Sequence, residues 1–130
     1  NRWFAPLLQP SDLGLARARL LAGDTEAAAE LGLTTLTSTR DIAPAVAAEA
    51  ASLLGQVAMS TGTKDRASEH YREAVALLTG VGQDRRAAQL WLDLGTHLEI
   101  LGDADAARDA YRRAAVASGL QMPLGLRANV

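Results

Sequence analysis

The sequence predicts an all-α fold, an α-solenoid of about three stacked helix pairs, from two observations. The first is composition, because 27 of the 130 residues are alanine and 21 are leucine, both strong helix formers. The second is a repeat with a period of 40 residues in the second half of the chain. A period of this size indicates helical units that stack on their neighbours.

The repeat relates two segments in which seven positions recur with the same spacing. The recurring residues are, in the second unit, Leu54-Gly55, Gly62, Ala67, Tyr71-Arg72 and Ala74, and, in the third unit, Leu94-Gly95, Gly102, Ala107, Tyr111-Arg112 and Ala114. A weaker first copy surrounds Gly23-Asp24, and it has Gly32 where the later copies have tyrosine. The chain therefore contains three units, of which the first is degenerate.

Each unit is expected to form two helices around a short turn. The turns carry glycine followed by aspartate or threonine, at Gly23-Asp24, Gly62-Thr63 and Gly102-Asp103. Glycine commonly ends a helix, and aspartate or threonine caps the start of the next one. The six predicted helices cover residues 11–22, 25–38, 42–61, 64–79, 85–101 and 104–118.

Capping and breaking residues also mark the connections between the units. Asp41 and Asp84 are candidate N-caps of the third and fifth helices. Pro44 falls in the first turn of the third helix, where its missing N–H does little harm. Gly80-Val81-Gly82 is expected to form a loop, because two glycines so close together would destabilise a helix.

The two ends of the chain are expected to lie outside the helical domain of residues 11–118. Residues 1–10 contain two prolines and no initiating methionine, so we expect a linker from an upstream domain of a longer protein. Residues 119–130 form a C-terminal tail that contains glycine, proline and several apolar side chains. This tail is expected either to fold back over the last helix pair or to mediate self-association as a homodimer.

Small residues inside the predicted helices indicate close helix packing. Gly55 and Gly95 occupy equivalent helical positions, although glycine there costs about 1 kcal/mol relative to alanine. We expect Tyr71 and Tyr111 to fill the space opposite these glycines. The same packing assigns Trp91 and the tyrosines to the core rather than to a ligand-stacking cluster.

Composition disfavours several classes of function. The net charge is −2 with no basic stripe, so direct nucleic-acid binding is not expected, and no apolar stretch is long enough to span a membrane. The absence of cysteine fits a reducing, cytoplasmic compartment. The two histidines, His70 and His97, lie 27 positions apart, so we expect no metal site and no cofactor.

The sequence predicts no catalytic residues, and we expect a protein that is not an enzyme. Hydroxyl side chains lack a nearby base that would activate them. His97 is either a hydrogen-bonded packing residue or a pH sensor or ligand contact, and the first interpretation is favoured. A helical enzyme fragment completed by missing residues is an alternative, which would need an acid–base or metal group converging on the groove.

The third unit resembles a tetratricopeptide (TPR) repeat. The residues that carry the resemblance are Trp91, Leu94-Gly95, Gly102, Ala107, Tyr111 and Ala114. The second unit keeps the pattern with Ala51 in place of Trp91, and the period is 40 residues where the family has about 34. The resemblance covers residues 11–118 and implies a right-handed superhelical stack whose first helices line a concave groove.

In this family the groove usually holds a peptide or a protein segment, and the pattern can be transferred residue by residue. The resemblance implies groove residues Arg17 and Leu20 in the first unit, Glu49, Ser52, Leu53, Gln56 and Met59 in the second, and Gln89, Leu92, Asp93, Thr96, Glu99 and Ile100 in the third. Alternatively, several of these residues only cap or solvate the stack. They lack the Lys/Asn/Arg cluster with which some TPR domains bind chaperone C-termini, so a co-chaperone role is disfavoured.

Residues 87–114 also resemble the closing repeat of bacterial transcriptional regulators that carry an N-terminal helix-turn-helix DNA-binding domain. The excess of arginine over lysine fits a high-GC bacterial source. This resemblance implies a C-terminal domain that senses a peptide, small effector or protein partner, or oligomerises, and that acts on DNA only through a missing N-terminal domain. The alternative is a stand-alone TPR scaffold or adaptor.

Overall fold

A computed structural model describes residues 10–119 of the chain, and these residues form six helices. The helices are α1 (Pro10–Leu21), α2 (Thr25–Thr39), α3 (Pro44–Ser60), α4 (Lys64–Gly80), α5 (Asp84–Ile100) and α6 (Ala104–Ala117). The all-α prediction is confirmed, and each predicted helix end lies within two residues of the observed one. The linker and tail predictions fall outside the described residues, apart from Pro10, which begins α1, and Gly119.

Four of the five connections between helices contain a glycine with positive φ. Gly23, Gly62 and Gly102 have φ values of 85°, 79° and 84°, as the predicted turns require, and Gly82 has 77°. Each is followed by a residue whose amide donates a hydrogen bond to a carbonyl five residues earlier, as in a Schellman motif. The turns within the units and the turn before α5 therefore share one geometry.

Helix capping agrees with the sequence in two turns and corrects it elsewhere. Asp24 accepts a hydrogen bond from the Ala27 amide at 3.1 Å, and Asp103 accepts one from the Ala106 amide at 3.2 Å. Thr63 occupies the N-cap of α4, but its hydroxyl donates to the Ala58 carbonyl at 3.0 Å instead of capping the helix.

The predicted caps of α3 and α5 were wrong. Pro44 is the first residue of α3, where a missing N–H is tolerated, so the N-cap falls on Ala43 and not on Asp41. Gln83 caps α5, and Asp84 lies one position later, in the first turn, where the helix dipole favours a carboxylate.

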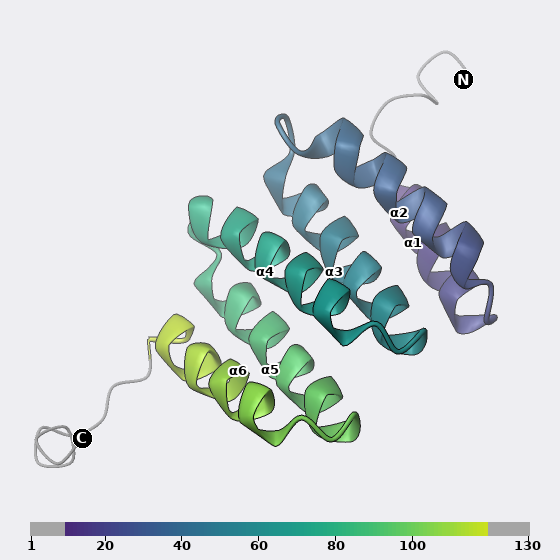
Figure 1. Ribbon diagram of the computed structural model, residues 1–130. Helices are drawn as coiled ribbons and strands as arrows, with labels where there is room; N and C mark the ends of the chain where they lie inside the picture. The colour runs from purple at the N-terminus through teal and green to yellow at the C-terminus, as the bar shows by residue number, and fades with distance from the viewer. Residues whose placement is uncertain (1–9, 120–130) are drawn as a thin grey trace, which may run out of the picture.

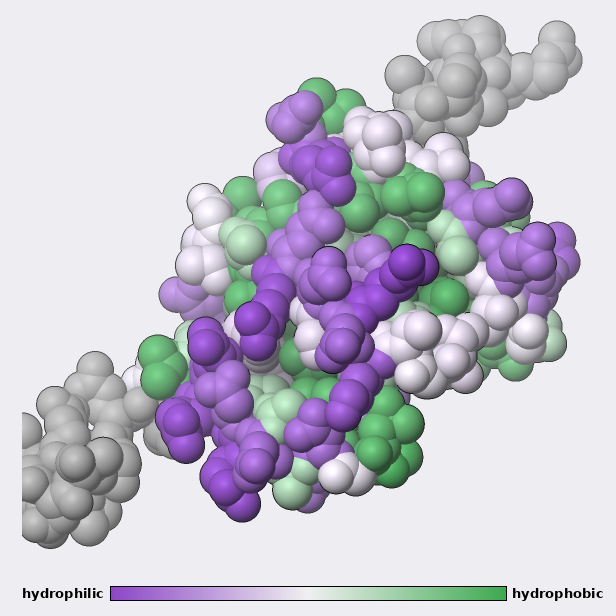
Figure 2. Space-filling model, viewed as in Figure 1, coloured by the Kyte–Doolittle hydropathy of each residue, from purple (hydrophilic) through white to green (hydrophobic). Residues whose placement is uncertain are grey.

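The first helix of each pair lies on one side of the molecule and the second helix on the other (Figure 1). Each helix packs against its neighbours in chain order, and α1 also contacts α3. Figure 2 shows that the face formed by α4 and α6 is largely hydrophilic. None of the helices within residues 10–119 is long and apolar enough to cross a membrane.

The core contains the glycine and tyrosine contacts that the repeat predicts. A Cβ atom added to Gly55 would lie 2.7 Å from Cδ2 and Cε2 of Tyr71, and one added to Gly95 would lie 2.7 Å from Cε1 of Tyr111. The two rings therefore cross their partner helices at a point where only glycine fits.

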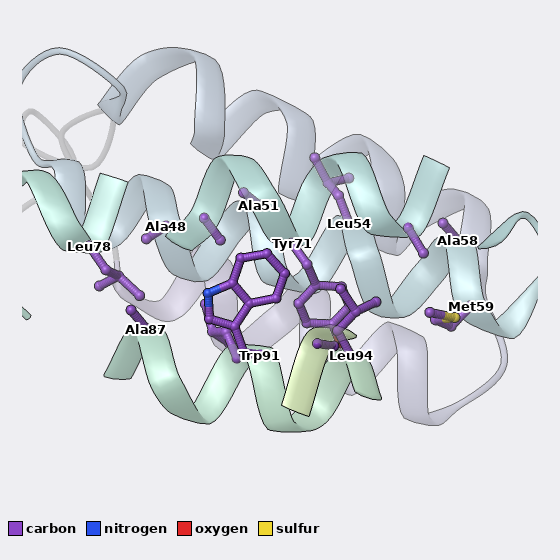
Figure 3. Packing of buried hydrophobic residues seen from close by; sticks show 14 of the residues in the cluster. Ala48, Ala51, Leu54, Ala58, Met59, Tyr71, Leu78, Ala87, Trp91 and Leu94 are labelled. Atoms are coloured by element: carbon purple, nitrogen blue, oxygen red, sulfur yellow. The ribbon is translucent and has the colours of Figure 1, made fainter. Parts of the chain in front are cut away.

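Trp91 belongs to the buried core, as predicted. Its ring extends from α5 toward Ala48 and Ala51 of α3, where the small side chains leave room for it (Figure 3). The guanidinium of Arg113 on α6 covers the ring at 5.4 Å from its centre, a distance at which cation–π attraction operates.

Candidate functional site

The candidate groove residues lie on α1, α3 and α5, and we call the surface that these helices share the first-helix face. Seven of the candidates are exposed there: Arg17, Gln89, Leu92, Asp93, Thr96, Glu99 and Ile100. Three are half-buried: Leu20, Glu49 and Gln56. The remaining three are buried: Ser52, Leu53 and Met59.

Ser52 and Leu53 belong to the core and not to the accessible face. The Ser52 hydroxyl donates to the carbonyl of Glu49 at 2.8 Å, within its own helix. Leu53 points to α2, because its Cδ2 would lie 3.3 Å from a Cβ atom on Gly32. Gly32 stands where the later units have tyrosine, and both Leu54 and Leu53 pack against it, at 3.2 and 3.3 Å from a Cβ atom added there.

A pocket lies at the C-terminal ends of the three first helices, and we call it the end pocket. Its volume is about 360 Å³, and it is lined by Leu20, Gln56, Met59, Ser60, His97, Ile100 and Leu101. Four of the predicted groove residues therefore meet in one place, with at least one from each helix pair. Met59 is buried but contributes to the pocket wall.

His97 lines this pocket, and it is half-buried. No hydrogen bond joins its ring to the residues that the structure describes, and the hydrogen-bonded packing role expected for His97 stays a prediction. Leu101 and Ser60 were not predicted to be site residues. They are the residues next to Ile100 and Met59, and the helix pattern alone gives no reason to turn them toward a shared pocket.

The other end of the first-helix face carries an ion-pair network that we call the Glu49 cluster, made of Arg17, Glu49, Arg86 and Gln89. Arg86 donates two hydrogen bonds of 2.7 Å to the two carboxylate oxygens of Glu49, and a third of 3.1 Å to Gln89. Arg17 on α1 lies 3.3 Å from the same carboxylate. One carboxylate on α3 thus binds cations from the pair before it and the pair after it.

The Glu49 cluster shifts the pKa of its central carboxylate. The hydrogen bonds from Arg86 lower the pKa of Glu49, against the opposing effect of burial, and the positive charge of Arg17 lowers it further. Arg86 was missed in the sequence because its partner is 37 residues away. No local pattern around Arg85-Arg86 singles out the arginine that points to α3.

The two tyrosine hydroxyls have different surroundings. The Tyr111 hydroxyl donates a hydrogen bond to Glu99 and lies 3.5 Å from the hydroxyl of Thr96. The Tyr71 hydroxyl is buried and makes no hydrogen bond of ordinary length and angle among residues 10–119, although the side chain of Gln56 lies near enough to lower its pKa. Burial raises the pKa of Tyr71, and the negative charge of Asp93 raises it further.

The site combines an apolar pocket, an internally neutralised ion-pair cluster and a row of exposed polar side chains. In the described part of the chain, no three histidine, aspartate or glutamate side chains are grouped so that they could hold a metal ion. No protein-family model matches the sequence, and a search of curated proteins finds no matching relative.

Proposed function

We propose that this chain is a TPR-like α-solenoid that binds an extended peptide, or a segment of a protein partner, on its first-helix face and performs no catalysis. The observation that carries the proposal is the end pocket. Leu20, Met59 and Ile100 come from three different helix pairs and line one pocket. The spacing of the repeat places them at equivalent ends of the first helices, as the TPR resemblance expects of groove residues.

The end pocket suits one apolar side chain of a ligand. Its volume lies near the lower limit of ligand pockets, which run from about 300 to 1,000 Å³. Ile100 and Leu101 at its edge are 75% and 42% exposed, so their apolar side chains are accessible to a ligand. Burying a leucine-sized side chain there would contribute about 1.5–3 kcal/mol to binding.

The remaining part of the face favours binding over chemistry. Gln89, Asp93 and Thr96 are exposed along α5 and offer hydrogen-bond donors and acceptors to a main chain. The charged groups with the strongest interactions, Glu49 and Arg86, are committed to each other and hold the helices together.

A sensing role in a transcriptional regulator, as the sequence resemblance implies, is part of the same proposal. A ligand on the first-helix face would contact α1, α3 and α5 together, the three helices that the Glu49 cluster also links. Binding would then change the angles between helix pairs, and rigid elements would transmit that change to a neighbouring domain.

Selection from a displayed library of random peptides tests the proposal directly. Peptides enriched on the wild-type protein should carry a shared apolar residue, and Ile100→Glu should weaken their binding about tenfold or more by placing a charge at the pocket. Fluorescence anisotropy with labelled peptides measures the dissociation constants.

Val116→Glu is the matched control, because Val116 is 74% exposed on α6 and lines a different pocket, beside Trp91. It should leave peptide binding unchanged. The proposal is wrong if no peptide is enriched, if both variants bind as tightly as the wild type, or if only Val116→Glu weakens binding.

A further inference from the structure

The position of the Tyr111 hydroxyl shows how far the side chain of a tyrosine at this repeat position extends. The ring crosses α5 over Gly95, and the hydroxyl contacts Thr96 and Glu99. Both of these residues are exposed on the first-helix face. A tyrosine on the second helix therefore passes through the helix pair and delivers its hydroxyl to the opposite side.

Tyr71 makes the same crossing one unit earlier, but its hydroxyl finds different neighbours. The ring crosses α3 over Gly55, and it would lie the same 2.7 Å from a Cβ atom added there. The residues 40 positions before Thr96 and Glu99 are Gln56 and Met59. A thioether is a weak acceptor compared with a carboxylate, so Met59 does not replace the partner that Glu99 provides to Tyr111. The amide of Gln56 lies near the Tyr71 hydroxyl but makes no hydrogen bond of ordinary geometry with it.

The result is a buried hydroxyl beneath the first-helix face that is unpartnered within the described chain. An unsatisfied buried hydroxyl destabilises the folded state, and phenylalanine would fill the same space without that cost. Buried polar groups are satisfied in most native structures, so an exception calls for an explanation.

We propose that the Tyr71 hydroxyl donates a hydrogen bond to a main-chain carbonyl of the peptide that occupies the first-helix face. This inference rests on the function proposed above and names the chemistry of one contact within it. Gln56 places the two features next to each other, because it lines the end pocket and also lies close to the Tyr71 hydroxyl. Gln56 is half-buried, and its flexible side chain can move aside to admit the carbonyl.

The ligand group is a neutral carbonyl rather than a carboxylate. Asp93 lies near the Tyr71 hydroxyl, and the charge of the nearby Arg86 is already neutralised by Glu49, so a second anion would be repelled. The raised pKa of Tyr71, caused first by burial, keeps the hydroxyl protonated and able to donate at neutral pH. In an extended peptide, a carbonyl and the neighbouring side chain can reach adjacent sites, which suits a hydroxyl beside a pocket.

Tyr71→Phe and Tyr111→Phe form the matched pair of variants for a test with peptides selected on the wild-type protein. Tyr71→Phe should weaken binding about tenfold while the protein stays at least as stable as the wild type. Tyr111→Phe should lower stability slightly, because its hydroxyl already has partners within the chain. Val116→Glu on α6, which lines a different pocket, is the control that should leave binding unchanged.

Ester substitution along the selected peptide gives a second readout that a structural role for Tyr71 would not affect. Replacing one amide with an ester weakens the carbonyl as an acceptor. One position should lose affinity with the wild type and lose little or none with Tyr71→Phe, which is the coupling expected of a direct contact.

The inference is overturned if Tyr71→Phe binds the peptides as tightly as the wild type, if it loses stability and affinity together, or if no ester position is coupled to it. These results differ from a failure of the proposed function. In that case the peptides would be insensitive to Ile100→Glu, or none would be selected.

Discussion

The α3–α4 pair and the α5–α6 pair follow one sequence pattern but have different surroundings. In both, a tyrosine on the second helix crosses a glycine on the first. Tyr71 is fully buried, whereas Tyr111 is only partly buried. Most of α3 is buried, while α5 keeps a row of exposed residues along the first-helix face. The repeat therefore determines contacts within a pair, and position in the stack determines exposure.

The difference in burial between the α3–α4 pair and the α5–α6 pair reflects their different numbers of described neighbours. The middle pair is enclosed by neighbours on both sides, and its residues hold the stack together. Among the described residues the α5–α6 pair has a neighbouring pair on one side only, and the equivalent positions of α5 are exposed. Ser52 and Leu92 occupy the same repeat position, yet they are 2% and 47% exposed.

The largest difference between the pairs is expected when each tyrosine is truncated. Tyr71→Ala removes a fully buried ring and should cost about 3–5 kcal/mol of the free energy of unfolding, because a cavity remains between three helices. Tyr111→Ala should cost clearly less, since solvent already reaches the ring. Urea denaturation followed by circular dichroism measures both, and equal losses would contradict the distinction between the enclosed α3–α4 pair and the more exposed α5–α6 pair.

Replacing Gly55 and Gly95 with alanine should again destabilise the α3–α4 pair more than the α5–α6 pair, by a smaller margin than the tyrosine truncations. Alanine gains about 1 kcal/mol in helix propensity over glycine, whereas overpacking costs about 1–3 kcal/mol. At Gly55 the buried ring of Tyr71 cannot move away, so Gly55→Ala should be destabilising by about 1–2 kcal/mol. At Gly95 the ring of Tyr111 can rotate toward solvent, and Gly95→Ala should be nearly neutral.

The same denaturation experiment checks the glycine variants, with the exposed helical residue Gly14 as a reference. A Cβ atom at Gly14 would meet no atom within 4 Å, so Gly14→Ala should only gain helix propensity. If Gly55→Ala gained as much stability as Gly14→Ala, the close approach of Tyr71 to α3 would be wrong.

These contacts were predictable from the sequence because their signals are local. A helix needs its own periodicity and its own end signals, and the spacing of Gly55 and Tyr71 recurs at Gly95 and Tyr111. The six helices and the tyrosine packing therefore followed from the repeat. Even the two wrong caps, Asp41 and Asp84, lay close to the observed helix starts.

Exposure on the first-helix face could not be predicted in the same way, because it depends on residues far away in the sequence. Leu53 is buried beside Gly32 on α2, which has no side chain. The equivalent residue of the third unit, Asp93, is exposed and lies near Tyr71. The partners of Glu49 are 32 and 37 residues away. A single repeat pattern treats such positions as equal and cannot distinguish them.

The ion pairs offer a third and smaller comparison between contacts that join helix pairs and contacts within one helix. Glu49→Gln breaks a bidentate pair that links α3 to α5, and it should cost about 1 kcal/mol, since solvent partly screens the half-buried groups. Asp109→Asn breaks an exposed pair within α6 and should cause no measurable change. Equal effects in urea denaturation would show that the Glu49 cluster does not join the pairs.

The contribution of Glu49 should also depend on pH with a definite sign. Arg86 lowers the pKa of the folded carboxylate below its ordinary value of 4.5. The stabilisation is therefore present above pH 4.5 and is lost as the pH falls through the folded pKa. The stability difference between wild type and Glu49→Gln should be full at pH 7 and shrink in acid, and a difference that grew in acid would contradict the ion pair.

The smallest expected effect has opposite signs in the two pairs. Tyr71→Phe removes a buried hydroxyl that has no partner within residues 10–119, so stability should rise by about 1 kcal/mol or less. Tyr111→Phe removes the donor to Glu99 and should lower stability slightly, since water replaces the lost bond at an exposed carboxylate. Denaturation curves measured side by side under identical conditions resolve the two signs.

A loss of stability in Tyr71→Phe would mean that the hydroxyl is satisfied in solution, and the donor would then not be free for a peptide carbonyl. A gain would mean that the Tyr71 hydroxyl destabilises the folded chain, whereas the Tyr111 hydroxyl has a partner in Glu99. Protein sequences rarely retain such a cost without a compensating interaction, and Gln56, which lies close to the Tyr71 hydroxyl, lines the end pocket.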